Sequence, residues 1–110
     1  MNPRDLRLDD LHVHVAGDGP PLLLVHSINA AAGAHEMRPL TERLARRHTV
    51  YVPDLPGFGD SARRDIVYTP RLYTDALHAV NAAIRESHGP SPVPALALSL
   101  GCEFLARAAT

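Results

Sequence analysis

The sequence predicts an α/β fold, in which helices alternate with the strands of a parallel sheet and a β-hairpin comes first. Two observations carry this prediction. Short aliphatic runs of strand length are separated by two longer segments that repeat apolar residues at helical spacing. Strands that alternate with helices in this way form parallel sheets with right-handed crossovers. With 110 residues, the chain is expected to be one domain or part of one.

The composition excludes several classes of function. A net charge of −1 gives no electrostatic reason to expect binding to nucleic acid or to an anionic membrane. The 11 basic residues are all arginine, which excludes a Walker A phosphate loop and a Schiff-base lysine. The aliphatic runs are too short to cross a bilayer, and residues 1–7 contain no apolar stretch of signal-peptide length. We therefore expect a soluble, cytoplasmic protein.

The hairpin is predicted over residues 6–15. Residues 6–8 and 11–15 alternate apolar and polar side chains around a pair of aspartates. His12 and His14 fall on the polar face of the second strand, where we expect them to be solvated. A metal site built on this pair would need further ligands. The sequence shows none nearby, so no metal is expected.

The middle of the chain predicts two strands and a helix. A turn rich in glycine and proline leads into the apolar run 22–25, which is typical of a strand buried on both faces. Residues 49–52 are rich in β-branched side chains and predict the next strand. Between them, a helix is expected over residues 36–47, with Pro39 in its first turn and an apolar face formed by Met37, Leu40 and Leu44.

A second helix is expected to begin at Pro70, with Thr69 as its N-cap, and to end at Gly89-Pro90. Its apolar stripe consists of Tyr73, Ala76, Leu77, Val80, Ala83 and Ile84. A proline-rich link then leads to a short strand over residues 95–98, which we expect to be buried.

Residues 95–109 indicate a strand, a sharp turn and a helix, with Ser99 at the apex of the turn. Ala97 and Gly101 are small residues placed two before and two after this serine, where strand and helix must approach closely. A serine that merely caps a helix is common, but that role does not explain small residues on both sides. The pattern favours a nucleophile elbow.

Three stretches in order resemble the α/β-hydrolase family: residues 22–28 (LLLVHSI), 54–61 (DLPGFGDS) and 96–101 (LALSLG). The resemblance runs from about Leu6 to Thr110 and places the strand before Ser99 beside strand 22–25. It implies that Ser99 is the nucleophile and that the backbone N–H groups of Ile28 and Leu100 form the oxyanion hole. It also implies structural roles in the loops for His26, Asp54, Gly57 and Gly59. Ser27 stands where the family usually has glycine.

The chemistry that the resemblance implies is hydrolysis of carboxylic esters through an acyl-enzyme on Ser99, with no metal and no organic cofactor. The partner would be a small ester-like molecule. Lipase, C–C hydrolase and cofactor-free haloperoxidase variants remain open, whereas branches with aspartate at the nucleophile position do not fit. The family's acid and histidine follow the nucleophile. Residues 1–110 are therefore expected to be the N-terminal part of one α/β-hydrolase domain, without cap or C-terminal strands, and inactive alone.

Two alternatives compete with this interpretation. A non-catalytic binding module, or an inactive fragment, would show the same fold signals. The string 57–62 also fits the dinucleotide pattern G-x-G-x-x-A, but that motif needs a helix to open at once, and the next predicted helix begins only at Pro70. Asp60, Arg63 and Arg64 are expected to be solvated loop charges, although Asp60 is also a candidate for lining the substrate entrance. The lone Cys102 is expected to be a small core residue.

Overall fold

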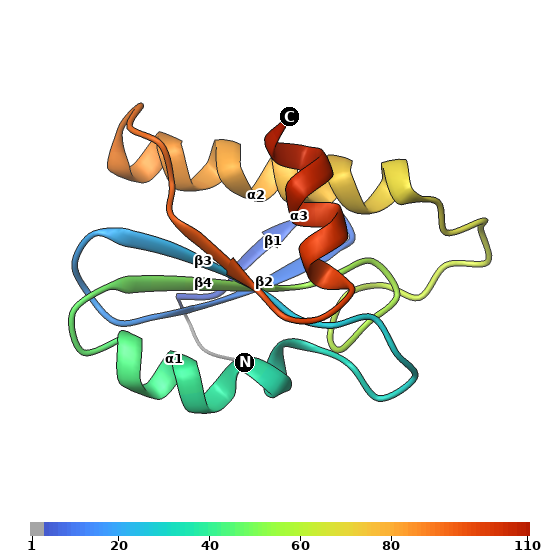
Figure 1. The fold of residues 1–110 in the computed structure, drawn as a ribbon, viewed down its shortest axis with the longest axis horizontal. Coiled ribbons are helices and arrows are strands. Elements are labelled where there is room, and N and C mark those ends of the chain that lie inside the picture. The colour runs from blue at the N-terminus through green and yellow to red at the C-terminus, as the bar shows by residue number, and fades with distance from the viewer. Residues whose placement is uncertain (1–3) are drawn as a thin grey trace.

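The computed structural model describes residues 4–110, which form a five-stranded sheet with helices on both faces (Figure 1). The strands are β1 (Leu6–Leu8), β2 (Leu11–Ala16), β3 (Pro21–Val25), β4 (Thr49–Asp54) and β5 (Ala95–Ala97). The helices are the 3-10 turn η1 (Ala34–Met37), α1 (Arg38–Leu44), α2 (Pro70–His88) and α3 (Gly101–Ala109). The predicted α/β class is confirmed.

The strand order is β1-β2-β4-β3-β5. The predicted hairpin is confirmed, with β1 antiparallel to β2 and Leu8 opposite Leu11. β2 is antiparallel to β4, while β3 runs parallel to both β4 and β5. The expected neighbour relation between strand 22–25 and the strand before Ser99 is therefore also confirmed. Because β3 is parallel to both β4 and β5, the carboxyl ends of these three strands lie side by side at the same end of the sheet.

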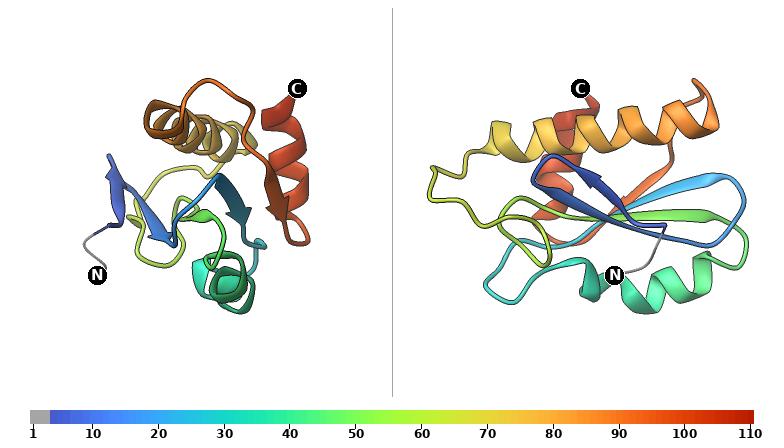
Figure 2. Two further views of the ribbon diagram at one scale, coloured as in Figure 1. Left: turned by 90° about the vertical axis from the view of Figure 1, so that its left-hand side faces the viewer. Right: turned by 180° about the vertical axis from the view of Figure 1, so that it is seen from behind.

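The two faces of the sheet are covered by different helices (Figure 2). α2 and α3 lie over one face, where Leu23, Tyr51 and Ile84 belong to the larger hydrophobic cluster. η1 and α1 lie over the other, where Leu24, Val50, Val52 and Met37 form the smaller one. α2 begins and ends as predicted: the Thr69 side chain accepts a hydrogen bond from Leu72 N–H, and Gly89 is the C-cap. No helix in the described part of the chain is long and apolar enough to span a membrane.

The helix expected over residues 36–47 is shorter than predicted, and its apolar face is partly wrong. Met37 belongs to the 3-10 turn η1, and the α-helix proper covers only Arg38–Leu44. Met37 packs with Leu24, Val50 and Val52 in the smaller cluster, and Leu44 packs against it. Leu40 is exposed to solvent instead.

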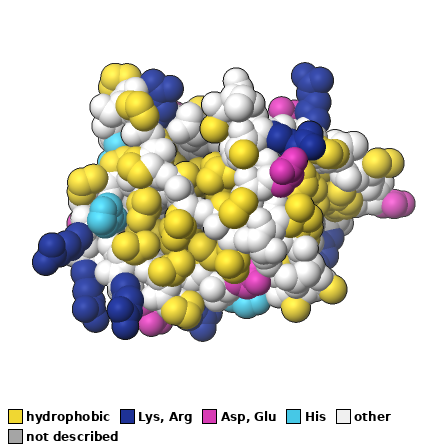
Figure 3. All heavy atoms as spheres, in the orientation of Figure 1, with side chains coloured by type: hydrophobic (Ala, Val, Ile, Leu, Met, Phe, Trp, Pro, Cys, Tyr) yellow, Lys and Arg dark blue, Asp and Glu magenta, His cyan; other side chains and the backbone are white. Residues whose placement is uncertain are grey.

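The strand expected over residues 95–98 forms as β5, but it is not buried as predicted. Within residues 4–110, β5 pairs only with β3, as expected for a chain that ends soon after this strand, and its outer edge has no neighbouring strand there. Leu96, Leu98 and Leu100 are exposed. The face of the molecule that includes this edge carries a broad band of hydrophobic side chains (Figure 3).

Candidate active site

Ser99 lies at the turn that joins β5 to α3, and its backbone adopts a left-handed conformation with φ of 53°. This conformation is uncommon for a residue other than glycine. Two backbone hydrogen bonds close the turn: Gly101 N–H donates to Leu98 O at 3.0 Å, and Cys102 N–H donates to Ser99 O at 2.9 Å. The side chain of Ser99 is exposed and hydrogen-bonds to no other residue in the range 4–110.

The start of α3 packs directly against the loop that follows β3. A Cβ atom at Gly101 would overlap the carbonyl oxygen of His26, and it would lie 3.3 Å from a methyl group of Val25. Leu98 N–H also donates to Val25 O at 3.0 Å. The Ser99 turn therefore lies beside the loop that contains Ile28.

The two predicted oxyanion-hole donors flank this junction. Ile28 comes two residues after His26, and Leu100 directly follows Ser99. Among the described residues, neither the Ile28 N–H nor the Leu100 N–H donates a hydrogen bond to a protein acceptor. Both amides are therefore available to a ligand.

His26 is fully buried and links two loops. Its Nδ1 lies 2.6 Å from the carbonyl oxygen of Ser27, which can only accept, so Nδ1 carries the proton. Its Nε2 accepts from Leu55 N–H at 2.9 Å. The ring of Phe58 meets the imidazole edge-on, with centroids 5.2 Å apart. Burial lowers the pKa of His26, so the ring stays neutral. With both ring nitrogens engaged, His26 is not free to act as a base.

Ser27 is held by Glu36, the second residue before α1. Ser27 Oγ lies 2.7 and 2.8 Å from the two carboxylate oxygens of Glu36, and Ser27 N–H donates to Oε1 at 3.0 Å. Asn29 Nδ2 donates to Ser27 Oγ at 2.9 Å. The hydrogen bond from the Ser27 side chain is the main cause that lowers the pKa of Glu36. A serine at this position thus gives the loop a side-chain attachment that glycine cannot supply.

Asp54 organises the glycine-rich loop that follows β4. Its carboxylate accepts from Ala34 N–H at 2.7 Å and from Asp60 N–H at 3.0 Å. A Cβ at Gly59 would overlap this carboxylate, and Gly59 also has a positive φ of 49°. At Gly57, where φ is 85°, a Cβ would meet the ring of Tyr68 at 2.9 Å. Both glycines are therefore required by the path of the loop.

The same loop does not open a helix. After residue 62 the chain continues without helix until α2 begins at Pro70, so the strand–turn–helix of a dinucleotide site is missing here. Asp60, Arg63 and Arg64 are exposed, as predicted for loop charges, and Arg64 pairs with Asp10 at 2.8 Å.

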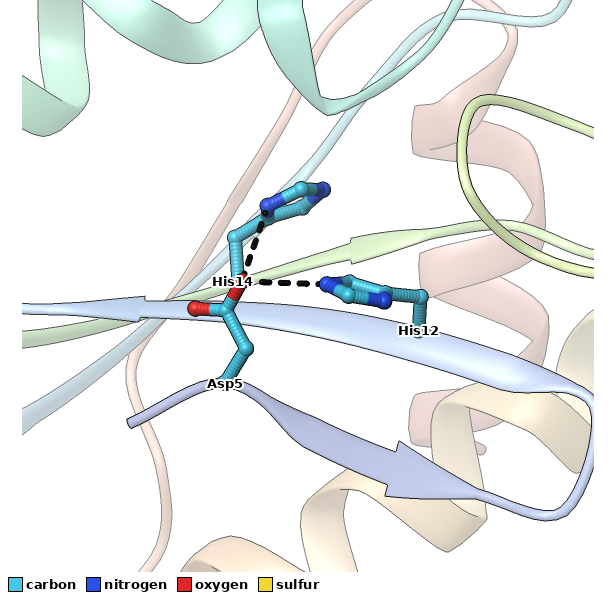
Figure 4. Close-up of side chains that lie close together, drawn as sticks. All are labelled: Asp5, His12 and His14. Carbon is cyan, nitrogen blue, oxygen red and sulfur yellow. Dashed lines mark hydrogen bonds and ion pairs between the residues drawn. The ribbon is translucent and has the colours of Figure 1, made fainter. Parts of the chain in front are cut away.

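The prediction that His12 and His14 are solvated is wrong for His12 and incomplete for His14. The side chain of His12 is 3% exposed and that of His14 is 34% exposed. Asp5, also 3% exposed, lies between them: its Oδ2 is 3.0 Å from His12 Nε2 and 3.5 Å from His14 Nδ1 (Figure 4). The carboxylate of Asp5 therefore covers both imidazoles, and His14 also lines a hollow together with Arg38 and Thr41 of α1. We call these three residues the Asp5 cluster.

Hydrogen bonds between carboxylates and imidazoles shift the pKa values in and around the Asp5 cluster. His14 Nε2 hydrogen-bonds to Asp54 Oδ2 at 2.7 Å, and this bond is the main cause that raises the pKa of His14. Burial acts to raise the pKa of Asp5, but hydrogen bonds from Val15 N–H and His12 outweigh it and hold the pKa below its usual range. Asp54 behaves likewise, since hydrogen bonds from His14 and two amides outweigh the effect of burial on its pKa. Both acids are carboxylates at neutral pH.

The prediction that Cys102 is a core residue is wrong. Cys102 is exposed on the first turn of α3, with Sγ 3.2 Å from Ala97 O. The core-facing residues of this helix include Phe104 instead.

Comparison with known proteins agrees with this geometry. A family model described as alpha/beta hydrolase fold matches residues 20–110. A pimeloyl-[acyl-carrier protein] methyl ester esterase from Xylella fastidiosa is 34% identical over 99 residues, which cover 90% of this chain and 34% of that protein. The chain thus spans about a third of the length of the curated relatives it matches.

Solved structures give the same result. An alpha/beta hydrolase fold protein from Burkholderia ambifaria superposes with a TM-score of 0.76 and 26% identity, covering 96% of this chain and 38% of that one. E-2-(acetamidomethylene)succinate hydrolase superposes with a TM-score of 0.77 and 27% identity, over 96% of this chain and 38% of that one.

Proposed function

The chain belongs to the α/β-hydrolase fold family, and from this membership we propose that it carries the nucleophile and oxyanion hole of a serine hydrolase that cleaves carboxylic esters. The observation that supports the proposal most directly is the exposed, left-handed backbone of Ser99 between β5 and α3. A strained strand-to-helix turn of this kind exposes a serine hydroxyl at the top of the sheet, within reach of a substrate carbonyl.

The reaction has two steps. Ser99 Oγ attacks the carbonyl carbon and gives its proton to a general base. The base passes that proton to the ester oxygen as the C–O bond breaks, so the alcohol leaves and an acyl-enzyme remains. The N–H groups of Ile28 and Leu100 donate to the carbonyl oxygen as it becomes negative, and each such donor contributes about 10²–10³ in rate. Water next attacks the acyl-enzyme, releases the acid and restores the serine. The family places the base and its acid after the nucleophile in sequence.

The name of one relative supports a proposal for the substrate class. The Xylella fastidiosa relative is named as a methyl ester esterase, so we propose small alkyl esters of carboxylic acids as substrates. His26, Asp54, Gly57 and Gly59 do not touch the substrate in this proposal. They hold the two loops that frame the Ser99 turn, through the hydrogen bonds and close contacts given above.

Covalent labelling of the natural gene product tests the proposal. A fluorophosphonate probe is expected to modify Ser99, and Ser99→Ala is expected to abolish both labelling and hydrolysis of p-nitrophenyl esters. Ser91→Ala is the matched control, because Ser91 is an exposed serine in the link before β5 and its loss should leave labelling intact. A folded wild-type protein that takes up no probe would reject the hydrolase and favour a binding module on the same fold.

A further inference from the structure

We propose that Asp5, His12 and His14 form a binding site for a divalent transition metal, with zinc as the ion that fits best. The site is separate from the Ser99 turn and does not depend on the proposed hydrolase activity. Imidazole nitrogens and a carboxylate oxygen are ordinary ligands for zinc, and sites with three protein ligands leave one position to water or another ligand.

The spacing of the donor atoms supports the proposal. Asp5 Oδ2 lies 3.0 Å from His12 Nε2 and 3.5 Å from His14 Nδ1, and all three atoms lie within 4.8 Å of one another. Two ligands bound about 2.0–2.1 Å from a tetrahedral zinc are separated by about 3.3 Å. Figure 4 shows the carboxylate between the two imidazoles, with the donor atoms converging on it from β2. Small side-chain movements therefore suffice to admit the ion.

Hydrogen bonds to neighbouring groups hold two of the proposed ligands, His14 and Asp5, in place. His14 Nε2, the nitrogen turned away from Asp5, hydrogen-bonds to the buried carboxylate of Asp54 at 2.7 Å. Metal-ligating histidines usually donate their second N–H to such a group, which fixes the ring and raises its basicity. The second oxygen of Asp5 accepts from Val15 N–H at 3.0 Å, which fixes the carboxylate in the same way.

His14 gives the cluster one side that reaches solvent. His14 lines a hollow of about 340 Å³ together with Asp54, Arg38 and Asp60. Asp5 and His12 are almost fully buried and do not line this hollow, whereas the side chain of His14 remains about one-third exposed. An ion is therefore expected to enter beside the exposed ring of His14.

Metal binding would change the tautomer of His12. Arg7 Nη2 lies 3.3 Å from His12 Nδ1, and because arginine only donates, His12 Nδ1 accepts and Nε2 carries the ring proton. A metal binds neutral imidazole through the nitrogen without a proton, so binding at His12 Nε2 moves the ring proton to Nδ1, and Arg7 must turn away from that nitrogen. The nitrogen resonance of His12 Nε2 thus reports directly on occupancy of the site.

The test is titration of the purified wild-type protein with Co²⁺ and then Zn²⁺. We expect saturable one-to-one binding of Co²⁺ with visible d–d absorption, displacement by Zn²⁺, and loss of the His12 Nε2 proton in imidazole NMR spectra. His14→Gln removes the Nδ1 ligand while its side-chain amide can still donate to Asp54, so folding should survive. This variant should weaken Zn²⁺ binding at least tenfold, because loss of a mere hydrogen-bond partner of a metal ligand already costs about 10–100-fold.

Two controls separate this site from adventitious binding. His78→Ala removes an exposed histidine on α2 and should leave the titration unchanged. Asp5→Asn should weaken binding as His14→Gln does. If wild type shows no saturable binding, or if both Asp5→Asn and His14→Gln bind like wild type, the three side chains form a hydrogen-bonded cluster only and the proposal is wrong.

Discussion

Ser27 donates to Glu36 from both its hydroxyl and its backbone N–H: the single hydroxyl proton is shared between the two carboxylate oxygens, at 2.7 and 2.8 Å, and the N–H donates to Oε1 at 3.0 Å. Ser27 is buried, so removal of Glu36 leaves both of its donors without an acceptor. We expect Glu36→Ala to lower the free energy of unfolding by about 1–3 kcal/mol, the usual cost of an unsatisfied buried polar group. Urea denaturation measures this change.

A double-mutant cycle isolates the Ser27–Glu36 interaction. Ser27→Gly introduces the residue usual in the family, and Glu36→Ala should cost less in that background than in wild type because the hydroxyl donor is gone. Glu42→Ala is the control, since Glu42 is an exposed glutamate on the neighbouring helix α1. Strict additivity of the Ser27 and Glu36 changes would show that the two residues do not stabilise the loop together.

The buried imidazole of His26 predicts a pH dependence of stability. Its pKa is lowered by burial from the ordinary value of 6.5. Below pH 6.5, His26 therefore becomes protonated in the unfolded chain but stays neutral in the folded protein. The free energy of unfolding falls as the pH drops toward the pKa of His26 in the folded state. His26→Gln does not titrate and can still accept from Leu55 N–H.

Urea denaturation of wild type and His26→Gln measures this pH dependence. The pH is varied between about 5 and 8, a range that brackets the ordinary pKa of histidine. Wild type should lose stability relative to His26→Gln as the pH falls, because His14 and the other groups are common to both proteins. A constant difference across this range would mean that His26 titrates normally in the folded state.

Gly101→Ala tests the contact between α3 and the loop after β3. Alanine at a helical position normally stabilises by about 1 kcal/mol relative to glycine. Here the new methyl group would overlap the carbonyl oxygen of His26, so we expect a net loss of about 1–3 kcal/mol, as for other overpacked sites. Glu103→Ala, at an exposed position of the same helix, should change stability far less. Thermal unfolding that is unchanged or improved by Gly101→Ala would exclude this close approach.

Two isoleucines provide a matched test of the core. Ile84 on α2 is 0% exposed, whereas Ile66, in the loop before α2, is 43% exposed. Ile84→Ala is expected to cost about 2–5 kcal/mol of unfolding free energy, because it leaves a cavity between α2 and the sheet. Ile66→Ala should cost well under 1 kcal/mol, as surface substitutions usually do. Equal effects in calorimetry would contradict this placement of α2.

The sequence predicted best those features that depend on local pattern. The hairpin and the ends of α2 followed from alternation and capping residues. The position of β5 beside β3 was implied by the resemblance to the α/β-hydrolase family. What the pattern did not predict was burial set by distant parts of the chain. Within residues 4–110 the aliphatic β5 has a neighbour on one side only and is exposed, and Cys102 lies on the outer side of α3.

The burial of the Asp5 cluster could have been predicted from the register of the hairpin. A two-residue turn at Asp9 and Asp10 pairs Leu8 with Leu11 and Leu6 with Val13. Continuing the register by one residue sets Asp5 opposite His14, on the same face as His12. The partnership of Ser27 with Glu36 could not be found in this way, because it depends on how the loop after β3 folds back toward η1.

If Ser99 is the proposed nucleophile, its left-handed backbone lowers stability at the residue whose hydroxyl group the reaction needs. A serine with φ of 53° holds a conformation that glycine adopts at no steric cost, and such strain typically amounts to about 1–3 kcal/mol. A laboratory selection for heat resistance alone would therefore favour glycine at this position. Retention of serine in a lineage is then a sign that selection acts on the hydroxyl group rather than on the fold.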